Sequence, residues 1–233
     1  LIKLADTESA RQLSKRCRLY CCSSTGCVSS GCKDVRAAVN DALKSHGLEK
    51  DVETVPTGCM GLCSRGPLMR VEVKGQEPVL YQELDPLTAR LVVAEHIDRA
   101  LALPEGTPFK TPEYLLKHVL DLNLPFFKLQ HKIVLAHTGT VDPEKIEDYL
   151  SRGGYKALEK ALEMGPEKII AEMKASGLRG RGGGGFPTGV KWDLTSKNKG
   201  AEKFIICNGD EGDPGAYMDR CILEGDPHAV LEG

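Results

Sequence analysis

A glycine-rich stretch at residues 177–192, GLRGRGGGGFPTGVKW, constrains this chain more than any other feature. Seven of its sixteen residues are glycine, and residues 182–185 form one unbroken row. In regular structure each glycine lowers folding stability by roughly 0.5–1 kcal/mol relative to alanine, so the four glycines of the row together lower it by roughly 2–4 kcal/mol. A compensating interaction is therefore expected. Backbone N–H groups that point together at an anion would supply one, because no side chain blocks the approach.

The residues beside the row indicate which ligand it binds. Arg179, Arg181 and Lys191 bring positive charge, while Phe186 and Trp192 offer flat apolar faces. Flexible linkers are rich in glycine and serine and lack such arginine and aromatic residues between the glycines. The composition therefore favours a binding loop for an anionic, planar ligand over a flexible linker.

Two familiar phosphate-binding signatures do not explain the row. A Walker loop needs GxxxxGK followed by Ser or Thr, and the chain has no such run. Gly180, Gly182 and Gly185 match GxGxxG, but that fingerprint marks a dinucleotide site only between a strand and a helix. Here a helical pattern precedes the glycines and Pro187 follows them. The match is therefore interpreted as coincidental.

A second motif, CNGDEGDPGAYMDR at residues 207–220, follows a predicted short strand at residues 203–207. Asn208, Asp210 and Glu211 can accept hydrogen bonds from ring N–H groups and ribose hydroxyls. The next residues, Asp-Pro-Gly at 213–215, are typical of a turn. The motif therefore predicts polar ligand contacts at the end of a strand.

Composition limits the class of protein. With 233 residues the chain is long enough for one large or two ordinary domains. A net charge of −2 gives no electrostatic case for binding nucleic acid or an anionic membrane. No apolar run approaches the roughly 20 residues of a spanning helix. The nine cysteines concentrate in the first third rather than forming a disulfide framework, which favours a reducing cytoplasm, although a removed leader stays open.

The first hundred residues predict a small α/β domain. Apolar patterning indicates strands at 18–20, 52–55, 68–73 and 79–81, with a Lys-Gly hairpin turn at 74–75. Helices are expected at 33–46 and from Asp85, which caps a first turn containing Pro86. The predicted division is a domain at 1–103, a linker at 104–112 and a second domain at 113–233. In the second domain, helices are expected after Asp142 and Pro143, at 153–162, and from Pro166 to Gly177.

Two cysteine pairs in the first domain suggest a metal centre. Cys22 and Cys27 are separated by four residues, and Cys59 and Cys63 by three. Four thiolates on two loops after strands can hold an iron–sulfur cluster, and zinc accepts a similar set. Cys32 stands at the same spacing from Cys27, so the residues alone do not decide between it and Cys22. A redox dithiol would need CxxC, which is absent. Cys207 and Cys221 lack any ligand spacing.

The paired glycine-rich and acidic motifs resemble the NADH-oxidising flavoprotein subunit of respiratory complex I. They also resemble the diaphorase or beta subunits of NAD(P)-linked hydrogenases and formate dehydrogenases, and NGDEGDPG is most similar to the hydrogenase branch. CSSTGCVSSG and TGCMGLC resemble the thioredoxin-like 2Fe–2S domain that is fused ahead of the flavin domain in several hydrogenase subunits. The implied fold is therefore a thioredoxin-like ferredoxin domain followed by the start of an α/β flavin- and NADH-binding domain.

The resemblance also implies site residues. Gly31 stands four residues after the second cysteine of the family pattern, which implies Cys22, Cys27, Cys59 and Cys63 as the 2Fe–2S ligands. Phe186 is implied to stack on NAD(H) or NADP(H). The residues implied to hold FMN are Gly180, Arg181, Gly182, Gly183, Lys191, Asn208, Asp210 and Glu211.

The function implied is electron input. Hydride moves between NAD(P)H and FMN, and single electrons leave through iron–sulfur clusters to other subunits of a hydrogenase or formate dehydrogenase. A 4Fe–4S cluster is expected only in a C-terminal part beyond these residues, and this portion alone is expected to bind flavin weakly. Two alternatives stay open: a zinc-stapled binding module with an anion-binding loop and no redox activity, and an electron-transfer scaffold that keeps the cluster but lacks dehydrogenase activity.

Overall fold

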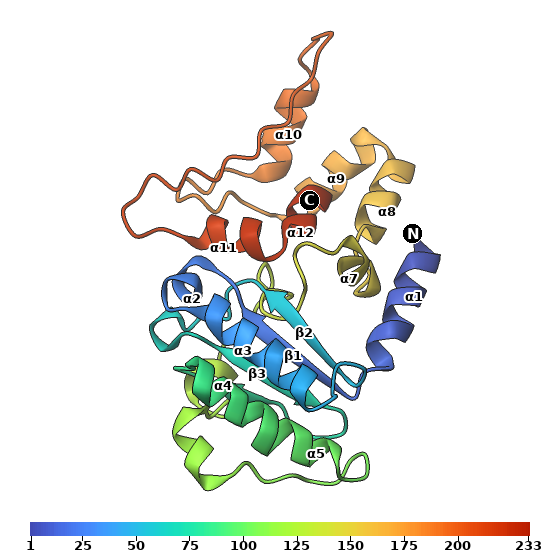
Figure 1. The fold of residues 1–233 in the computed structure, drawn as a ribbon. Coiled ribbons are helices and arrows are strands. Elements are labelled where there is room, and N and C mark those ends of the chain that lie inside the picture. Colours follow the sequence, from blue (N-terminus) through green and yellow to red (C-terminus); the bar gives the residue numbers. More distant parts are fainter. The chain divides into compact units, whose positions relative to one another are not determined.

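A five-stranded sheet is the centre of the first of two compact units in this computed structural model, which describes residues 1–233 (Figure 1). The first unit contains residues 1–153 and 211–231, and the second contains residues 154–210 and 232–233. The sheet has the order β2-β1-β3-β4-β5. Its strands are β1 (Cys17–Cys22), β2 (Val52–Thr57), β3 (Met69–Val73), β4 (Val79–Tyr81) and β5 (Val119–Leu120).

The pairing of the strands makes a mixed sheet, with one parallel pair and three antiparallel pairs. β1 and β2 are parallel, with Cys17 opposite Val52 and Cys22 opposite Thr57. A parallel pair needs a crossover, which α2 (Thr25–Ser29) and α3 (Cys32–Ser45) supply. β3 is antiparallel to both β1 and β4. The predicted α/β fold class, with its strand-helix-strand unit followed by a hairpin and a helix, is confirmed.

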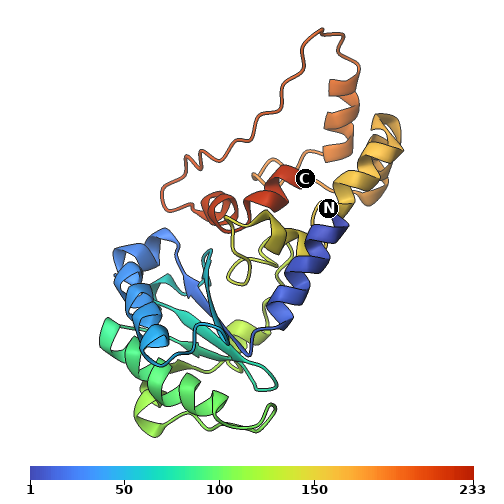
Figure 2. The same ribbon diagram turned by 45° about the vertical axis from the view of Figure 1, so that its right-hand side comes forward.

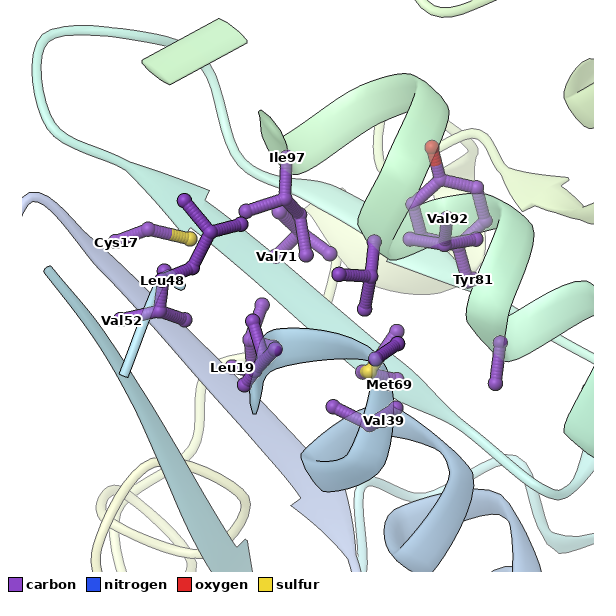
Figure 3. Packing of buried hydrophobic residues seen from close by; sticks show 14 of the residues in the cluster. Cys17, Leu19, Val39, Leu48, Val52, Met69, Val71, Tyr81, Val92 and Ile97 are labelled. Atoms are coloured by element: carbon purple, nitrogen blue, oxygen red, sulfur yellow. The ribbon is translucent and has the colours of Figure 1, made fainter. Parts of the chain in front are cut away.

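One face of the sheet packs on helices through a large apolar core. Because strand side chains alternate between faces, Cys17, Leu19 and Cys21 of β1 all point to this core. Val39 of α3 packs there, as do Val92 of α4 (Pro86–Val92) and Ile97 of the π-helical turn η2 (Val93–Asp98), which leads into α5 (Arg99–Leu101) (Figure 3). Phe109, from the predicted linker, packs against the same cluster.

The opposite face carries a polar network under α1 (Ile2–Leu13), which lies on the other side of the sheet from α3 (Figure 2). Arg11 pairs with Glu53 of β2 at 2.7 Å. The buried carboxylate of Asp148, on α7 (Ile146–Ser151), accepts hydrogen bonds from Gln12 Nε2 at 2.9 Å and from the backbone N–H of residue 142 at 2.8 Å. Several donors thus satisfy this buried charge, as a buried carboxylate requires.

The rest of the first unit consists of short elements, and the second unit is helical. The short elements are η1 (Cys63–Arg65), η3 (Glu113–His118), α6 (Pro125–Lys128), α11 (Met218–Gly225) and α12 (Pro227–Glu232), the last of which ends in the second unit. The second unit contains α8 (Lys156–Met164), α9 (Pro166–Ser176) and α10 (Thr188–Ser196). None of the helices in the structure has the length and hydropathy needed to cross a membrane.

Most predicted elements are confirmed. The strands agree with the patterning to within a few residues, and β4 agrees at both ends. Asp85 caps α4 by accepting a hydrogen bond from Thr88 N at 2.6 Å, with Pro86 in the first turn. α9 begins at Pro166 and is closed by Gly177, whose φ of +67° is the left-handed conformation that glycine adopts readily.

One predicted element is wrong, and another is present but begins later than predicted. Residues 203–207 form no strand: Phe204, Ile205 and Ile206 are 80%, 100% and 85% exposed, and no segment pairs with their backbone. Apolar β-forming residues are not sufficient for a strand, because it needs a neighbour for its backbone and side chains. The helix expected after Asp142 and Pro143 begins only at Ile146. The carboxylate of Asp142 accepts from Glu144 N, and its own N–H is held by Asp148, so residues 142–145 form a turn instead.

The division of the sequence into domains stays a prediction. The compact units separate near residues 153 and 210, whereas the predicted linker lies at 104–112.

In the second unit, α9 and α10 pack closely against each other. A Cβ added to Gly189 of α10 would lie 2.5 Å from the backbone nitrogen and 2.8 Å from the Cα of Lys174 of α9. Only a residue without a side chain fits between these two backbones. Gly184 of the glycine row differs, because nothing lies within 4 Å of the corresponding point.

We expect Gly189→Ala to destabilise the second unit, because the new methyl group would force α9 and α10 apart. Overpacking of this kind lowers the free energy of unfolding by about 1–3 kcal/mol. Gly184→Ala is the matched control, with an expected change within about 0.5 kcal/mol. Urea unfolding followed by circular dichroism measures both, and equal stability of the two variants would contradict the packing described.

A buried histidine makes stability depend on pH. His96 is 3% exposed, and its Nδ1 lies 2.6 Å from the hydroxyl of Tyr81. Burial lowers the pKa of His96 to about 4, from an ordinary value of 6.5. Between these values the unfolded chain binds a proton that the folded chain does not. The free energy of unfolding is therefore highest above pH 6.5, where His96 is neutral in both states, and it decreases as the pH falls from 6.5 toward 4.

We expect His96→Gln, which can still hydrogen-bond to Tyr81 but does not titrate, to flatten the pH dependence of unfolding between pH 6.5 and 4. The change in slope should approach about 1.4 kcal/mol per pH unit. His131→Gln removes an exposed imidazole and should leave the slope unchanged. The measurement is a series of urea unfolding curves across this range, and parallel pH profiles for all three proteins would refute the assignment.

Candidate functional site

The four predicted cysteine ligands lie together in the first unit. Sγ of Cys59 is 3.5 Å from Sγ of Cys63. Cys22 and Cys27 pack in the same buried cluster, and the thiols of Cys27 and Cys59 both act on the pKa of Cys22, which is raised. The four thiols are therefore neighbours.

The parallel pair of strands brings these thiols together. Cys22 is the last residue of β1, and Cys59 follows the end of β2 at the same edge of the sheet. Two glycines allow the loops to meet: a Cβ added to Gly26 would lie 3.1 Å from Cβ of Cys63, and one added to Gly66 would lie 2.9 Å from Sγ of Cys27. Side chains at these positions would push the loops apart.

The spacing of the sulfurs suits metal ligation. Two thiolates on one tetrahedral metal ion, with metal–sulfur bonds of about 2.3 Å, are about 3.8 Å apart, close to the distance between Cys59 and Cys63. No three Cys, His, Asp or Glu side chains converge on one point that could hold a single metal ion. The four thiols therefore match a cluster in number, and Cys59 and Cys63 also match it in spacing, without the geometry of a formed mononuclear site.

Neighbouring thiols shift one another's proton affinities. The contact with Cys22 lowers the pKa of Cys27, and the same contact raises the pKa of Cys22 to about 11. The pKa of Cys59 is raised, first by its contact with Cys22 and then by burial. The backbone N–H of Gly61 donates to Sγ of Cys59 at 3.3 Å. Cys27 is therefore the thiol most ready to ionise, and metal binding must displace protons from the others.

The structure places the other cysteines of this region in two clusters. Cys32 is the first residue of α3 and packs in the same buried cluster as Cys22 and Cys27. Cys17 and Cys21 belong to the apolar core. The choice of Cys22 over Cys32 as the partner of Cys27, and the ligand set itself, therefore stay predictions.

Sequence reasoning missed Cys221. This residue of α11 is 9% exposed, and it lines the same cavity as Cys59. Burial, followed by the nearby Cys59, raises the pKa of Cys221 to about 11. No sequence signal marks this contact, because Cys221 has no partner at a ligand-like spacing and reaches Cys59 only through the tertiary fold.

The glycine-rich stretch forms a closed loop in the second unit. Gly180 N donates to Phe186 O at 2.8 Å, and Thr188 N donates to Leu178 O at 2.9 Å. Arg179 Nε crosses the loop to the carbonyl of Gly185 at 2.6 Å. Gly183 and Gly185 have φ values of +94° and +61°, which favour glycine. The loop therefore joins α9 to the N-terminus of α10 in a defined conformation, unlike a linker.

The tip of this loop is open to a ligand. Nothing lies within 4 Å of the point where a Cβ would stand at Gly182 or Gly183. Arg181 and Lys191 are exposed, and neither forms an ion pair. Phe186 is 51% exposed. Bare backbone, two free cationic side chains and an aromatic face next to a helix N-terminus can together bind a planar anion.

The acidic motif is less organised than the loop. Asn208 and Asp210 are exposed residues of the second unit, and Asn208 Oδ1 accepts from Asp210 N at 3.0 Å. Glu211 belongs to the first unit, where its carboxylate accepts from Arg220 N at 2.7 Å and so caps the first turn of α11. The predicted flavin contacts of these three residues stay predictions.

Comparison with known proteins shows what the C-terminal part is similar to. Residues 173–233 match the family model of the Nuo51 FMN-binding domain. The chain is 51% identical over 105 residues to the HndC subunit of the NADP-reducing hydrogenase of Solidesulfovibrio fructosivorans, matching 45% of this chain and 21% of that one. It is 56% identical over 88 residues to a subunit of the NADH-quinone oxidoreductase of Aquifex aeolicus, matching 38% of this chain and 20% of that one. The chain therefore spans about a fifth of the length of these curated relatives.

Two kinds of solved structure are similar at a lower level. A thioredoxin-like [2Fe-2S] ferredoxin from Aquifex aeolicus matches 46% of this chain and 98% of its own, with 19% identity and a TM-score of 0.37. An NAD+-reducing [NiFe]-hydrogenase in the H2-reduced state matches 97% of this chain and 36% of its own, with 20% identity and a TM-score of 0.37. At these TM-scores neither similarity decides fold or function. The sequence matches do confirm the predicted resemblance: residues 173–233 are similar to the Nuo51 FMN-binding domain, and the relatives are named as subunits of a hydrogenase and of NADH-quinone oxidoreductase.

Proposed function

We propose that this chain is the electron-input part of an NAD(P)-linked redox complex of the hydrogenase or formate dehydrogenase type. The observation that carries the proposal is the match of residues 173–233, which contain the glycine-rich loop and the acidic motif, to an FMN-binding family. The relatives are named as subunits of an NADP-reducing hydrogenase and of NADH-quinone oxidoreductase. The partners proposed are therefore other subunits of such a complex, in a reducing cytoplasm.

The glycine-rich loop is the proposed flavin site. FMN supplies chemistry that the side chains lack, because it takes up two electrons at once and releases them singly. The unpaired charges of Arg181 and Lys191 support a role in binding its phosphate, together with the backbone N–H groups of Gly180, Gly182 and Gly183. Asn208, Asp210 and Glu211 are proposed to accept hydrogen bonds from the rest of FMN, and exposed Phe186 to stack on NAD(P)H.

The four neighbouring thiols are the proposed site of a 2Fe–2S cluster. Cys22, Cys27, Cys59 and Cys63 supply the four sulfurs that such a cluster needs, and their loops are held at one edge of the sheet. The N–H group of Gly61 already points at one of these sulfurs. These residues would hold a one-electron carrier in a site that is largely buried from water.

A zinc-stapled domain without redox activity is the competing function. Zinc is held by the same thiolates, so the ligand types do not separate the two metals. The metal content and the visible absorbance of the purified protein do separate a zinc site from an iron–sulfur cluster.

We expect the anaerobically purified chain to absorb visible light and to contain about two iron and two sulfide ions per chain. Cys59→Ser should abolish or shift the visible spectrum, because it replaces a ligand thiolate at the centre of the group. Cys17→Ser, in the apolar core, is the control and should keep the spectrum of the unaltered protein. A colourless protein with about one zinc would establish the competing function.

We expect Lys191→Glu to weaken FMN binding by roughly 10–100-fold, which corresponds to the roughly 1.5–3 kcal/mol of a hydrogen bond to a charged group. Lys168→Glu, on the exposed surface of α9, makes the same change of charge away from the loop and should have little effect. Quenching of flavin fluorescence measures the affinities. Equal affinities for the two variants would remove Lys191 from the proposed site.

A further inference from the structure

α11 packs directly on the loop that carries Cys59. A Cβ added to Gly58 would lie 2.3 Å from Cα of Gly225, the last residue of α11. A Cβ added to Gly225 would lie 3.0 Å from Cγ2 of Thr138. The helix and the loop therefore meet backbone to backbone, at a distance that only glycines on both sides permit.

This contact directs one face of α11 at the cysteines. Cys221 stands four residues before Gly225, so the two residues share a helix face. Cys221 is 9% exposed, and burial together with the nearby thiol of Cys59 raises its pKa. Both cysteines line a cavity of about 310 Å³ whose other walls include Phe126, Leu135 and Tyr217. Cys221 is thus a fixed neighbour of the proposed cluster and not a bystander thiol.

We propose that Cys221 is a positioning residue for the 2Fe–2S cluster, and that its S–H group donates a hydrogen bond to the sulfur of Cys59 and raises the reduction potential of the cluster. This inference rests on the proposed function, because it requires a cluster at the four thiols.

The direction of the effect follows from charge. Reduction adds an electron to a group that already carries the negative charge of its thiolates, so a donor aimed at a ligand sulfur stabilises the reduced state more than the oxidised state. The N–H group of Gly61 is one such donor, at 3.3 Å from Sγ of Cys59. Cys221 supplies a second donor to the same sulfur, in a region with little access to water.

The donor also connects two motifs. The acidic motif runs directly into α11, where Glu211 caps the first turn through Arg220 N at 2.7 Å. The segment proposed to contact flavin therefore continues into the helix that touches a proposed ligand of the cluster. A shift of α11 along its axis would lengthen the contact between Cys221 and Cys59 and lower the potential.

The test is an anaerobic redox titration of the full chain, followed by visible absorbance and electron paramagnetic resonance. We expect Cys221→Ala to give a more negative midpoint potential than the unaltered protein, with iron and sulfide content unchanged. Cys221→Ser keeps a donor and should restore most of the potential. Cys17→Ala removes a buried thiol from the apolar core and should leave the potential unchanged.

The outcomes are distinguishable. If the unaltered protein contains no iron and sulfide, the proposed function fails and the inference fails with it. If the cluster is present and Cys221→Ala has the unaltered potential, the inference alone is overturned. If Cys221→Ala and Cys221→Ser lower the potential equally, packing of the side chain is responsible and the hydrogen bond is again refuted.

Discussion

The parallel pairing of β1 with β2 is the constraint on which the candidate metal centre depends. Side-by-side parallel strands end at the same edge of a sheet, so the loops that follow them become neighbours although α3 separates them in sequence. Register matters as much as direction, because Cys22 lies opposite Thr57 and places Cys59 just beyond the edge. A slip of one residue would turn alternate side chains to the other face and move Cys22 away from Cys59.

The apolar core and the polar network hold this register from both faces of the sheet. Leu19 and Val39 lie in a dry interior where a shift would open cavities, which typically lowers stability by several kcal/mol. On the opposite face Arg18 pairs with Glu53 of β2 at 3.0 Å and ties the two parallel strands by charge. The fold itself therefore brings the four thiols together at one edge of the sheet.

Sequence patterning predicted what local physics determines and missed what depends on distant contacts. The N-cap of α4 at Asp85 and the end of α9 at Gly177 follow from neighbouring residues, and both are confirmed. The strands of the sheet follow from the pattern of apolar residues, and they are confirmed as well. The strand at residues 203–207 failed because pairing is not encoded in the segment itself. Cys221 was missed for a related reason, since its position next to Cys59 is produced by the packing of Gly58 on Gly225.

Glycine has two different physical roles in this chain, and the difference separates scaffold from site. At Gly58, Gly66 and Gly189 a side chain would collide with backbone or with a cysteine sulfur, so glycine there permits close packing. At Gly182 and Gly184 a side chain would meet empty space and φ is not positive, so neither packing nor a turn gives a reason for its absence. A glycine that neither turns nor packs against the protein has a reason to exist if something outside the protein approaches it. The open tip of the loop, flanked by unpaired positive charge, is where we therefore place the ligand.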